Sequence, residues 1–572
     1  MFNILEHTSS HFWTLIKSAR ECWYERHSTG ENHFRKRIAD GSAILSFIVC
    51  FLRSPLPFPF FFRYTWRTMN ETDFLKLQNG SDIRGVALEG VDGEHVNLTP
   101  DVCRNIGAAF ALWLARKTGR KPANLVIGVG RDSRLSGQAL ENSIIEGLAA
   151  EQVDILRCSL ATTPAMFMGT VFDETHFDGS IMITASHLPF NRNGFKFFDQ
   201  AGGLEHDDIT AILRFAAAQH IDCKQNVSLK TRSFDLIALY SEHLKKAIRN
   251  GLNFQAEKPL AHLKIAVDAG NGAGGFFAER VLGELGADTS GSRFLEPDGA
   301  FPNHIPNPEN KAAMEAAKNA VVQSHSDLGL IFDTDVDRMS AVLADGTEVN
   351  RDAIIAMTAA ILAPDYPHST IVTDSVTSDR LTVFLEQELG LTHLRYMRGY
   401  KNVINKCREL NERGISCPLA METSGHGALK ENYYLDDGAY LAVKLVTALA
   451  TAKHDGKNIE SLIAKLPPLI EETEVRFTIR GADFKDYGAA VLQSVKERAQ
   501  KAGFDLPESY EGVRISFKSA EVQGWMLLRL SLHDPVMPLN IESMQKGGID
   551  KLKDIARMLL DGFERLDISA LD

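Results

Sequence analysis

The chain alternates short runs rich in β-branched residues with longer amphipathic stretches from residue 88 onward, and this alternation limits its possible folds more than any other feature. The predicted strands of this region are 124–130, 153–159, 180–186, 263–270, 327–335 and 369–376. The predicted helices are 100–119, 137–151, 274–287, 380–390 and 438–452. Repeated strand-helix units pack as helices on largely parallel sheets, so we expect α/β layers.

The end of the chain has a different order. Strands are predicted at 474–481, 514–519 and 525–533, with one helix between the first two and one at the terminus. A chain of 572 residues is too long for one core and should hold about three or four domains. We therefore predict three similar α/β domains with mixed, largely parallel sheets, followed by a small α+β domain. Their expected limits are 69–230, 231–347, 348–465 and 466–572.

Composition restricts the class of protein. A hydrophobic fraction of 44% and a charged fraction of 24% are typical of a folded, soluble chain. The net charge of -12 argues against sequence-independent binding to nucleic acid, which needs a basic surface. The seven cysteines are scattered and never spaced C-x-x-C, which favours a reducing compartment such as the cytoplasm over a disulfide framework or a zinc site.

Residues 1–68 differ from the rest of the chain. Their apolar stretch, 43–62, is interrupted by Arg53 and three prolines, so it is not predicted to span a membrane. A leader for a plastid or another organelle is one interpretation, although acidic residues are unusual in such leaders. The other is that Met69 is the true start. We expect an N-terminal extension that is disordered or not native.

An acidic motif, FDTDVDR at 332–338, ends the predicted strand of the second domain. Asp333, Asp335 and Asp337 can converge where the backbone curls at a strand end, and three carboxylates suit Mg²⁺. An exposed acidic turn is the alternative. An EF-hand is excluded, because its sixth and twelfth positions would be Arg338 and Ala344 instead of glycine and glutamate.

A glycine-rich segment, DAGNGAGG at 268–275, matches G-x-G-x-x-G between a predicted strand and a predicted helix. Glu296 follows at about the distance expected for a dinucleotide site, which is the best argument for an oxidoreductase. However, Glu296 sits beside a Pro-Asp-Gly turn and not at the end of a strand. The alternative, a tight turn that lets strand and helix pack closely, is favoured.

Further polar motifs follow other predicted strands. Ser186 and His187 lie in ITASHLPFNRNGFKFF, on a turn stiffened by proline, asparagine and glycine, with Lys196 ten residues beyond the serine. VGRDSRLSG places Arg131 and Arg134 around an Asp-Ser turn, either as a solvated, self-paired charge cluster or as a phosphate contact.

Two more loops carry polar residues of interest. Arg84 in NGSDIRG fits a simple surface turn. METSGHG, 421–427, combines Glu422, Ser424 and His426 with two glycines, which suits sugar hydroxyls or an ordinary polar loop.

Together these motifs resemble those of the alpha-D-phosphohexomutase family, the phosphoglucomutase and phosphomannomutase group. The resemblance runs from about residue 80 to about residue 540. It rests on TASHLP (TASHNP in the family), the N-G-x-K that follows, D-x-D-x-D-R and the E-x-S-G-H loop, all in family order. It implies a phosphoserine domain, a metal-binding domain, a sugar-binding domain and a C-terminal phosphate-binding domain around a central cleft. The Asp436-Asp437-Gly438 turn also looks like a family feature and is expected to be structural.

The resemblance implies a phosphoserine at Ser186 and an Mg²⁺ ion that bridges this phosphate and the three aspartates. A small-molecule phosphosugar would be the substrate, with a hexose 1,6-bisphosphate as intermediate and activator. No nucleic acid or membrane partner is expected, and monomer and dimer both stay open. The resemblance also implies roles for further residues. Positive charge would come from Arg84, Lys196 and Arg338, and proton transfer from His187, His426 or Lys196. The sugar would be bound by Glu422, Ser424 and Lys401, and the non-reacting phosphate by Arg529, Ser531 and His533 of RLSLHDP.

Some positions depart from the family pattern, among them Leu188, Thr334, Met421, Ser81 and Leu532. None of these departures removes a metal ligand or the serine, so we expect catalysis to survive with a shifted substrate preference. Three functions stay open: a phosphomannomutase or phosphoglucomutase, a phosphoglucosamine mutase, and a catalytically silent phosphosugar-binding relative.

Overall fold

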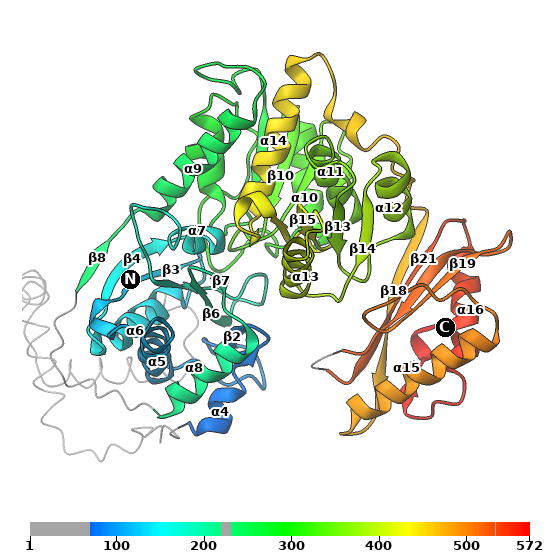
Figure 1. Cartoon of the computed structure of the whole chain (residues 1–572), viewed down its shortest axis with the longest axis horizontal. Helices are drawn as coiled ribbons and strands as arrows, with labels where there is room; N and C mark the ends of the chain where they lie inside the picture. Colours follow the sequence, from blue (N-terminus) through cyan, green and yellow to red (C-terminus); the bar gives the residue numbers. More distant parts are fainter. Residues whose placement is uncertain (1–68, 219–229, 532–533, 572) are drawn as a thin grey trace, which may run out of the picture. The chain divides into compact units, whose positions relative to one another are not determined.

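The computed structural model describes residues 69–218, 230–531 and 534–571, so the predictions for residues 1–68 and for His533 fall outside the described residues. Within this part of the chain the strands form four separate sheets that follow one another in sequence (Figure 1). The first three are mixed sheets covered by helices, and the fourth is antiparallel. The predicted fold class is therefore confirmed.

The first sheet has eight strands in the described residues, in the order β1-β2-β6-β5-β3-β4-β8, with β7 paired to β6. Its strands are β1 (Gln78–Asn79), β2 (Asp82–Val86), β3 (Val126–Arg131), β4 (Asp154–Leu160), β5 (Gly179–Ile183), β6 (Arg192–Asp199), β7 (Gly202–Gly203) and β8 (Thr231–Ser233). β3 runs parallel to β4 and β5, whereas β6 is antiparallel to β5 and β2. The boundary predicted at residue 230 falls at the edge of β8, which pairs with β4.

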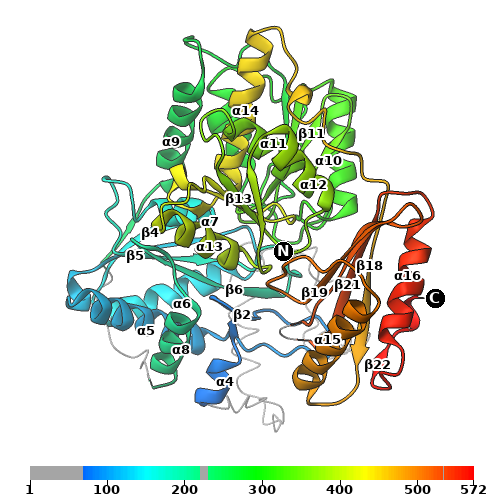
Figure 2. The ribbon, with the colours of Figure 1, turned by 45° about the vertical axis from the view of Figure 1, so that its right-hand side comes forward.

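Helices cover both faces of this sheet (Figure 1, Figure 2). They are α4 (Glu71–Leu75), α5 (Pro100–Thr118), α6 (Gly137–Ala150), α7 (Thr163–Met168), α8 (His206–Ala218) and α9 (Leu236–Gly251). Side chains alternate along β5, so Ile181 and Ile183 join the core that includes α5, α6 and α8, and Met182 joins the core that includes α7 and α9.

The second and third sheets also combine parallel and antiparallel pairs. The second has the order β12-β11-β10-β9 and the third β14-β13-β15-β16-β17. Their strands are β9 (Ile265–Asp268), β10 (Leu328–Phe332), β11 (Met339–Leu343), β12 (Glu348–Val349), β13 (Thr370–Thr373), β14 (Thr392–Arg395), β15 (Leu419–Met421), β16 (Gly427–Leu429) and β17 (Leu435–Asp436). The accompanying α-helices are α10 (Lys311–Ser324), α11 (Asp352–Leu362), α12 (Asp379–Val383), α13 (Tyr400–Glu412) and α14 (Gly438–His454).

The fourth sheet has the order β19-β20-β21-β18-β22, and its pairs are antiparallel. Its strands are β18 (Glu471–Ile479), β19 (Val513–Lys518), β20 (Gln523–Leu528), β21 (Val536–Ser543) and β22 (Leu566–Asp567), and α15 (Phe484–Lys501) and α16 (Gly548–Leu560) pack on it. This is the α+β domain that the change of order in the sequence predicted.

Local sequence signals set where the helices begin and end. α5 is capped by the Thr99 hydroxyl, which accepts a hydrogen bond from the Val102 N–H, and Pro100 takes the first helical position. Gly119 ends the helix with a positive φ of 68°. The helix boundaries at 100–119 could therefore be predicted from the sequence.

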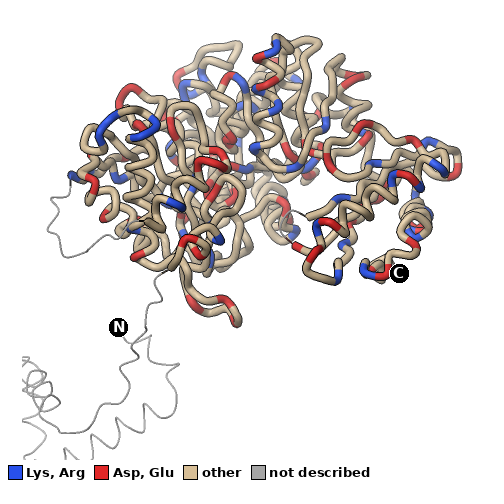
Figure 3. The backbone as a smooth tube through the Cα atoms, turned by 60° about the horizontal axis from the view of Figure 1, so that its bottom comes forward, with Lys and Arg blue, Asp and Glu red and all other residues tan. Residues whose placement is uncertain are grey.

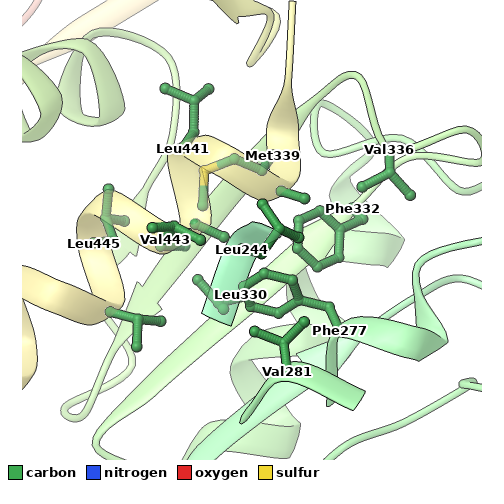
Figure 4. Packing of buried hydrophobic residues seen from close by; sticks show 14 of the residues in the cluster. Leu244, Phe277, Val281, Leu330, Phe332, Val336, Met339, Leu441, Val443 and Leu445 are labelled. Carbon is green, nitrogen blue, oxygen red and sulfur yellow. The ribbon is translucent and has the colours of Figure 1, made fainter. Parts of the chain in front are cut away.

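An apolar core anchors the loop that carries the acidic motif (Figure 4). The rings of Phe277 and Phe332 meet edge to face with centroids 5.4 Å apart, and Val336 and Met339 are fully buried beside them. Burying such a side chain contributes about 1.5–3 kcal/mol. Val336 has a φ of 67°, a conformation that costs a β-branched residue about 1–3 kcal/mol, and its burial in this core offsets that cost.

A buried histidine near this loop makes stability depend on pH. His304 Nε2 lies 3.0 Å from Asp268 Oδ1, and Nδ1 lies 3.0 Å from the carbonyl of Ile305. Burial lowers the pKa of His304, but the hydrogen bond to Asp268, its charge and the Ile305 carbonyl outweigh burial and raise the pKa above 6.5. This stabilisation is complete below the unfolded pKa and is lost as pH rises through the folded pKa.

We therefore expect His304→Gln to lower the free energy of unfolding by about 1–3 kcal/mol at pH 6, and by less at pH 8. Urea unfolding of both proteins across this pH range measures the difference. A difference that is constant with pH would contradict a charged His304.

Lys and Arg are interspersed with Asp and Glu along the described chain (Figure 3). None of the helices in this part of the chain combines the length and the apolar composition that a membrane crossing requires.

Candidate active site

The serine loop, the acidic loop and the E-x-S-G-H loop occupy equivalent places in the three α/β domains. Each forms the turn of an antiparallel hairpin whose first strand also has a parallel neighbour: residues 184–191 join β5 to β6, 333–338 join β10 to β11, and 422–426 join β15 to β16. Ligands bind α/β sheets at the carboxyl ends of parallel strands, where these turns lie. The backbones of Arg338 and His426 pair across the second and third loops.

The serine loop holds its central residue in a strained conformation. Ser186 is 6% exposed and has a φ of 50°, and its N–H donates to the Thr184 hydroxyl at 2.9 Å. A non-glycine residue persists in this conformation only where its surroundings enforce it, and such residues cluster at functional sites.

Arg134 holds the backbone of the serine loop in this conformation. Its guanidinium donates to the carbonyls of Ser186 and Leu188, and also to those of Pro189 at 2.9 Å and Arg192 at 3.1 Å. Arg134 is 1% exposed, so the expectation of a solvated charge cluster is wrong for this residue. The five donors of a guanidinium suit several carbonyls at once, a role that the local sequence did not reveal.

Asp333, Asp335 and Asp337 converge in the loop after β10. One carboxylate oxygen from each lies within 4.8 Å of the others, and all three side chains are fully buried. Asp335 Oδ1 and Asp337 Oδ1 are buried without a hydrogen-bond partner. Buried acceptors without donors need an explanation, and a divalent cation held by hard oxygen ligands supplies one, so the three residues fit a metal site. The exposed acidic turn is excluded.

The pKa values of the three aspartates are shifted in different directions by burial and by neighbouring charges. Burial and the neighbouring Asp337 and Asp335 raise the pKa of Asp333 well above its usual value, and burial and Asp337 raise that of Asp335. Burial also opposes the charge of Asp337, but Lys196 and nearby cations hold the pKa of Asp337 below its usual value. Thr163 steadies Asp335 by donating from its hydroxyl to Oδ2 and from its N–H to the carbonyl at 2.9 Å.

The structure brings the serine to the acidic loop. Ser186 Oγ lies 2.9 Å from Asp333 Oδ2 and 3.5 Å from Nη2 of Arg338. These two loops belong to different domains and are separated by about 150 positions in the sequence. A group attached to Ser186 would therefore face a metal-capable carboxylate and a guanidinium together.

Two further cations approach from the first domain. Lys196 Nζ donates to Asp337 Oδ2 at 2.9 Å and lies 3.8 Å from Asp82 Oδ2. Arg84 donates to the carbonyl of Thr184 at 2.6 Å and to Asp82 at 2.8 Å. Arg84 is thus part of the site and not of a simple surface turn.

The third-domain loop packs directly on the acidic loop. The N–H of Met339 donates to the carbonyl of Gly425 at 3.2 Å, and a Cβ on Gly425, which has a φ of 93°, would lie 2.7 Å from the Met339 carbonyl. Glu422 accepts a hydrogen bond from the Gly399 N–H at 2.6 Å. The Ser424 hydroxyl is buried with no hydrogen-bond partner, so it can bind a ligand hydroxyl.

The pKa values of the two candidate histidines are shifted in opposite directions. Burial and the charge of Arg338 lower the pKa of His187 to about 3, although its Nδ1 lies 3.3 Å from Ser186 Oγ. Burial also lowers the pKa of His426, but the charges of Asp436 and Asp337 outweigh burial and raise it. His187 is therefore uncharged at neutral pH, whereas the surroundings of His426 favour its protonated form.

Lys401 lines one pocket together with Lys196, Asp337 and Tyr400. Its ammonium donates to the carbonyl of Gly203 and to Glu205 at 3.2 Å, which ties α13 to the first domain. The ring of its neighbour Tyr400 lies 4.9 Å from Lys196 Nζ and stacks on His426 with centroids 5.3 Å apart. The Tyr400 hydroxyl lies 3.2 Å from Ser81 Oγ. The local sequence did not single out Tyr400, because Lys196 and Ser81 belong to the first domain and His426 lies 26 positions further along the chain.

Arg529 and Ser531 of the fourth domain both contact groups within the protein. Arg529 donates to Glu511 at 3.3 Å and to Asn540 at 3.3 Å. Glu511 also accepts from the Ser375 hydroxyl at 2.7 Å, which joins the fourth domain to the third. The Ser531 hydroxyl accepts from the Asp534 N–H at 3.2 Å.

The glycine-rich loop at 268–275 supports the acidic loop. A Cβ on Gly272 would lie 2.7 Å from the Thr334 carbonyl, and the Ala273 N–H donates to that carbonyl at 2.8 Å. Protein backbone therefore fills the space that a dinucleotide phosphate would need. The structure agrees with the favoured interpretation, a tight turn that allows close packing.

Comparison with known proteins identifies the family. Three family models match in order: phosphoglucomutase/phosphomannomutase alpha/beta/alpha domain I over residues 75–220, domain II over 238–346 and domain III over 350–469. The chain is 29% identical to a phosphomannomutase/phosphoglucomutase of Pseudomonas putida over 464 residues, which are 80% of this chain and 93% of the relative. It is 30% identical to a phosphoglucosamine mutase of Cronobacter sakazakii over 414 residues, which are 71% of this chain and 87% of the relative.

A crystal structure has the same fold. A phosphoglucomutase/phosphomannomutase family protein from Burkholderia thailandensis aligns with a TM-score of 0.69 at 26% identity, covering 87% of this chain and 98% of its own. The order of the motifs, the three hairpin turns and these matches agree. The chain belongs to the phosphoglucomutase/phosphomannomutase family, the alpha-D-phosphohexomutases.

Proposed function

We propose that the protein interconverts hexose 1-phosphate and hexose 6-phosphate, acting on mannose or glucose phosphates through a phosphorylated Ser186. The observation that carries this proposal is the 2.9 Å contact between Ser186 Oγ and Asp333, in a loop where three carboxylates converge. A phosphosugar would be the substrate, and a hexose 1,6-bisphosphate would be the intermediate and the activator.

The reaction is a pair of phosphoryl transfers. In the first, the 6-hydroxyl of a hexose 1-phosphate attacks the phosphorus on Ser186; the new P–O bond forms as the bond to Oγ breaks, giving a 1,6-bisphosphate. In the second, the intermediate presents its 1-phosphate to Ser186 Oγ, which takes that phosphoryl group back. One proton leaves an attacking hydroxyl and one reaches a leaving oxygen in each transfer, so none is consumed.

Charge stabilisation is the main demand of such a transfer, because its transition state is loose and spread over three oxygens. Asp333, Asp335 and Asp337 would hold Mg²⁺, which when bound supplies positive charge at the phosphoryl group. Arg338, at 3.5 Å from Ser186 Oγ, and Lys196 add to it. Burial opposes the charge of Lys196, yet Asp337 and Asp82 raise its pKa well above the usual value, so it acts as a fixed cation.

Proton transfer is assigned to His426. A general acid must hold a proton at the working pH; the pKa of His187 is lowered to about 3, whereas the surroundings of His426 raise its pKa and favour a bound proton. Glu422 and Ser424 bind sugar hydroxyls. Arg529 and Ser531 bind the non-reacting phosphate, for which Arg529 must exchange its contact with Glu511.

A coupled assay tests the function. The protein is given glucose 1-phosphate, mannose 1-phosphate or glucosamine 1-phosphate with magnesium chloride and a catalytic amount of the 1,6-bisphosphate. We expect turnover of the glucose and mannose substrates, and a fraction of the purified protein that carries one additional phosphoryl group by intact mass. Preferred turnover of glucosamine 1-phosphate would reassign it as a phosphoglucosamine mutase. No turnover of any substrate would support a silent phosphosugar-binding relative.

A further inference from the structure

The turn at 436–438 carries two adjacent buried carboxylates with different partners. Asp437 is satisfied by structural donors: the Tyr240 hydroxyl at 2.6 Å, the Tyr440 N–H at 2.8 Å and the Asn432 amide at 2.9 Å. It caps the N-terminus of α14. Asp437 thus has the structural role that was expected for the whole turn.

Asp436 is bound to the backbone through one of its two carboxylate oxygens. Its Oδ1 accepts from the Gly427 N–H at 2.8 Å, and its Oδ2 forms an ion pair with Nδ1 of His426. Both side chains are buried, with 6% and 7% of their surface exposed. Because one carboxylate oxygen is anchored to the backbone, the other holds the imidazole in a fixed place.

The ring of His426 is held from a second direction. Tyr400 stacks on its face, with centroids 5.3 Å apart and planes 22° apart. Apart from Asp436, the other carboxylate near Nδ1 is Asp337, whose Oδ1 lies 3.8 Å away. Both carboxylates lie on the Nδ1 side of the ring and favour a hydrogen on that nitrogen, which would leave Nε2 to exchange a proton with a ligand.

We propose that Asp436 is a positioning residue for the proton transfer at His426. Its carboxylate fixes the imidazole orientation and keeps the hydrogen on Nδ1, so that Nε2 accepts the proton of the attacking hydroxyl as the new P–O bond forms and returns it to a leaving oxygen. The proposal rests on the proposed function, and it adds a residue that acts on the reaction through His426.

The kinetic test is Asp436→Asn, with Asp437→Asn as the matched control. An asparagine amide at 436 would donate to Nδ1 and favour the wrong tautomer, so we expect kcat to fall by about 100-fold or more, with KM changed by less than about threefold. Asp437→Asn should lower Tm and leave kcat within about threefold. In a His426→Gln background, Asp436→Asn should have little further effect. Equal losses of kcat from both asparagine variants, or losses that multiply in the double variant, would overturn the proposal.

A second measurement does not depend on activity. Histidine labelled with ¹⁵N reports which ring nitrogen carries the hydrogen, and His426→Gln identifies the signal of His426. We expect hydrogen on Nδ1 in the unchanged protein and on Nε2 in Asp436→Asn. The same tautomer in both proteins would overturn the proposal even if the mutase assay succeeds. Failure of the mutase assay with a changed tautomer would reject the proposed function and leave the contact between Asp436 and His426 established.

Discussion

Ser186→Ala will lose hexose phosphate interconversion by more than about 10⁴-fold, the scale of loss seen when an enzyme's nucleophile is removed. The hydroxyl is the only group at this position that can carry the phosphoryl group, and the cations around it cannot replace it. The coupled assay measures the loss. Intact mass should show that the additional phosphoryl group is absent from the variant.

Two further variants separate loss of the nucleophile from loss of the fold. Ser180→Ala, six residues earlier in β5, removes a hydroxyl that donates to the Met166 carbonyl at 2.7 Å, and it should keep its activity. Ser186→Gly removes the hydroxyl and relieves the φ of 50°, so it should be inactive with little change in Tm. Activity in Ser186→Ala within tenfold of the unchanged protein would contradict the phosphoserine mechanism.

Asp335→Asn is expected to lower activity by about 10²-fold or more while leaving the metal-free protein at least as stable as before. Burial first, and then Asp337, raises the pKa of Asp335, so its charge opposes folding. For a carboxyl group with a raised folded pKa, stability falls as pH rises above the unfolded pKa. Asparagine keeps an acceptor for Thr163 and removes the charge. The charge of Asp335 thus lowers the stability of the metal-free protein, and the same charge helps the three carboxylates to bind a cation.

Thermal unfolding with and without magnesium chloride measures the stability of the metal-free protein and the stabilisation by the bound ion. The unchanged protein should gain about 2.7 kcal/mol when the ion is present at 100 times its Kd, and Asp335→Asn should gain almost nothing. Asp345→Asn, an exposed aspartate in the turn after β11, is the matched control and should respond to magnesium like the unchanged protein. A magnesium-dependent rise in Tm that survives in Asp335→Asn would show that the metal binds elsewhere.

The serine loop and the acidic loop each contain one residue with a strained backbone conformation. Ser186 and Val336 both have positive φ, and each costs about 1–3 kcal/mol. Arg134 offsets the first cost by binding the loop carbonyls, and the core around Phe332 offsets the second. Rigid support of this kind holds reacting groups in place during phosphoryl transfer.

The sequence alone determined the fold class, the three hairpin motifs and the family. Strand and helix periods depend on neighbours within a few residues, so helix α5 and the strand before Asp333 could be predicted. The serine, the acidic triplet and the E-x-S-G-H loop are likewise short segments, and their residue types are specific enough to be identified without a structure.

Tertiary structure decided which side chains meet those motifs. Arg134, Tyr400 and Asp436 contact Ser186 or His426 from other segments of the chain, and Lys401 contacts a glutamate of the first domain. The solvated interpretation of Arg134 failed because burial depends on the whole packed domain. Contacts between segments far apart in the chain arise when hydrophobic burial closes the domains on one another, and no local pattern encodes them.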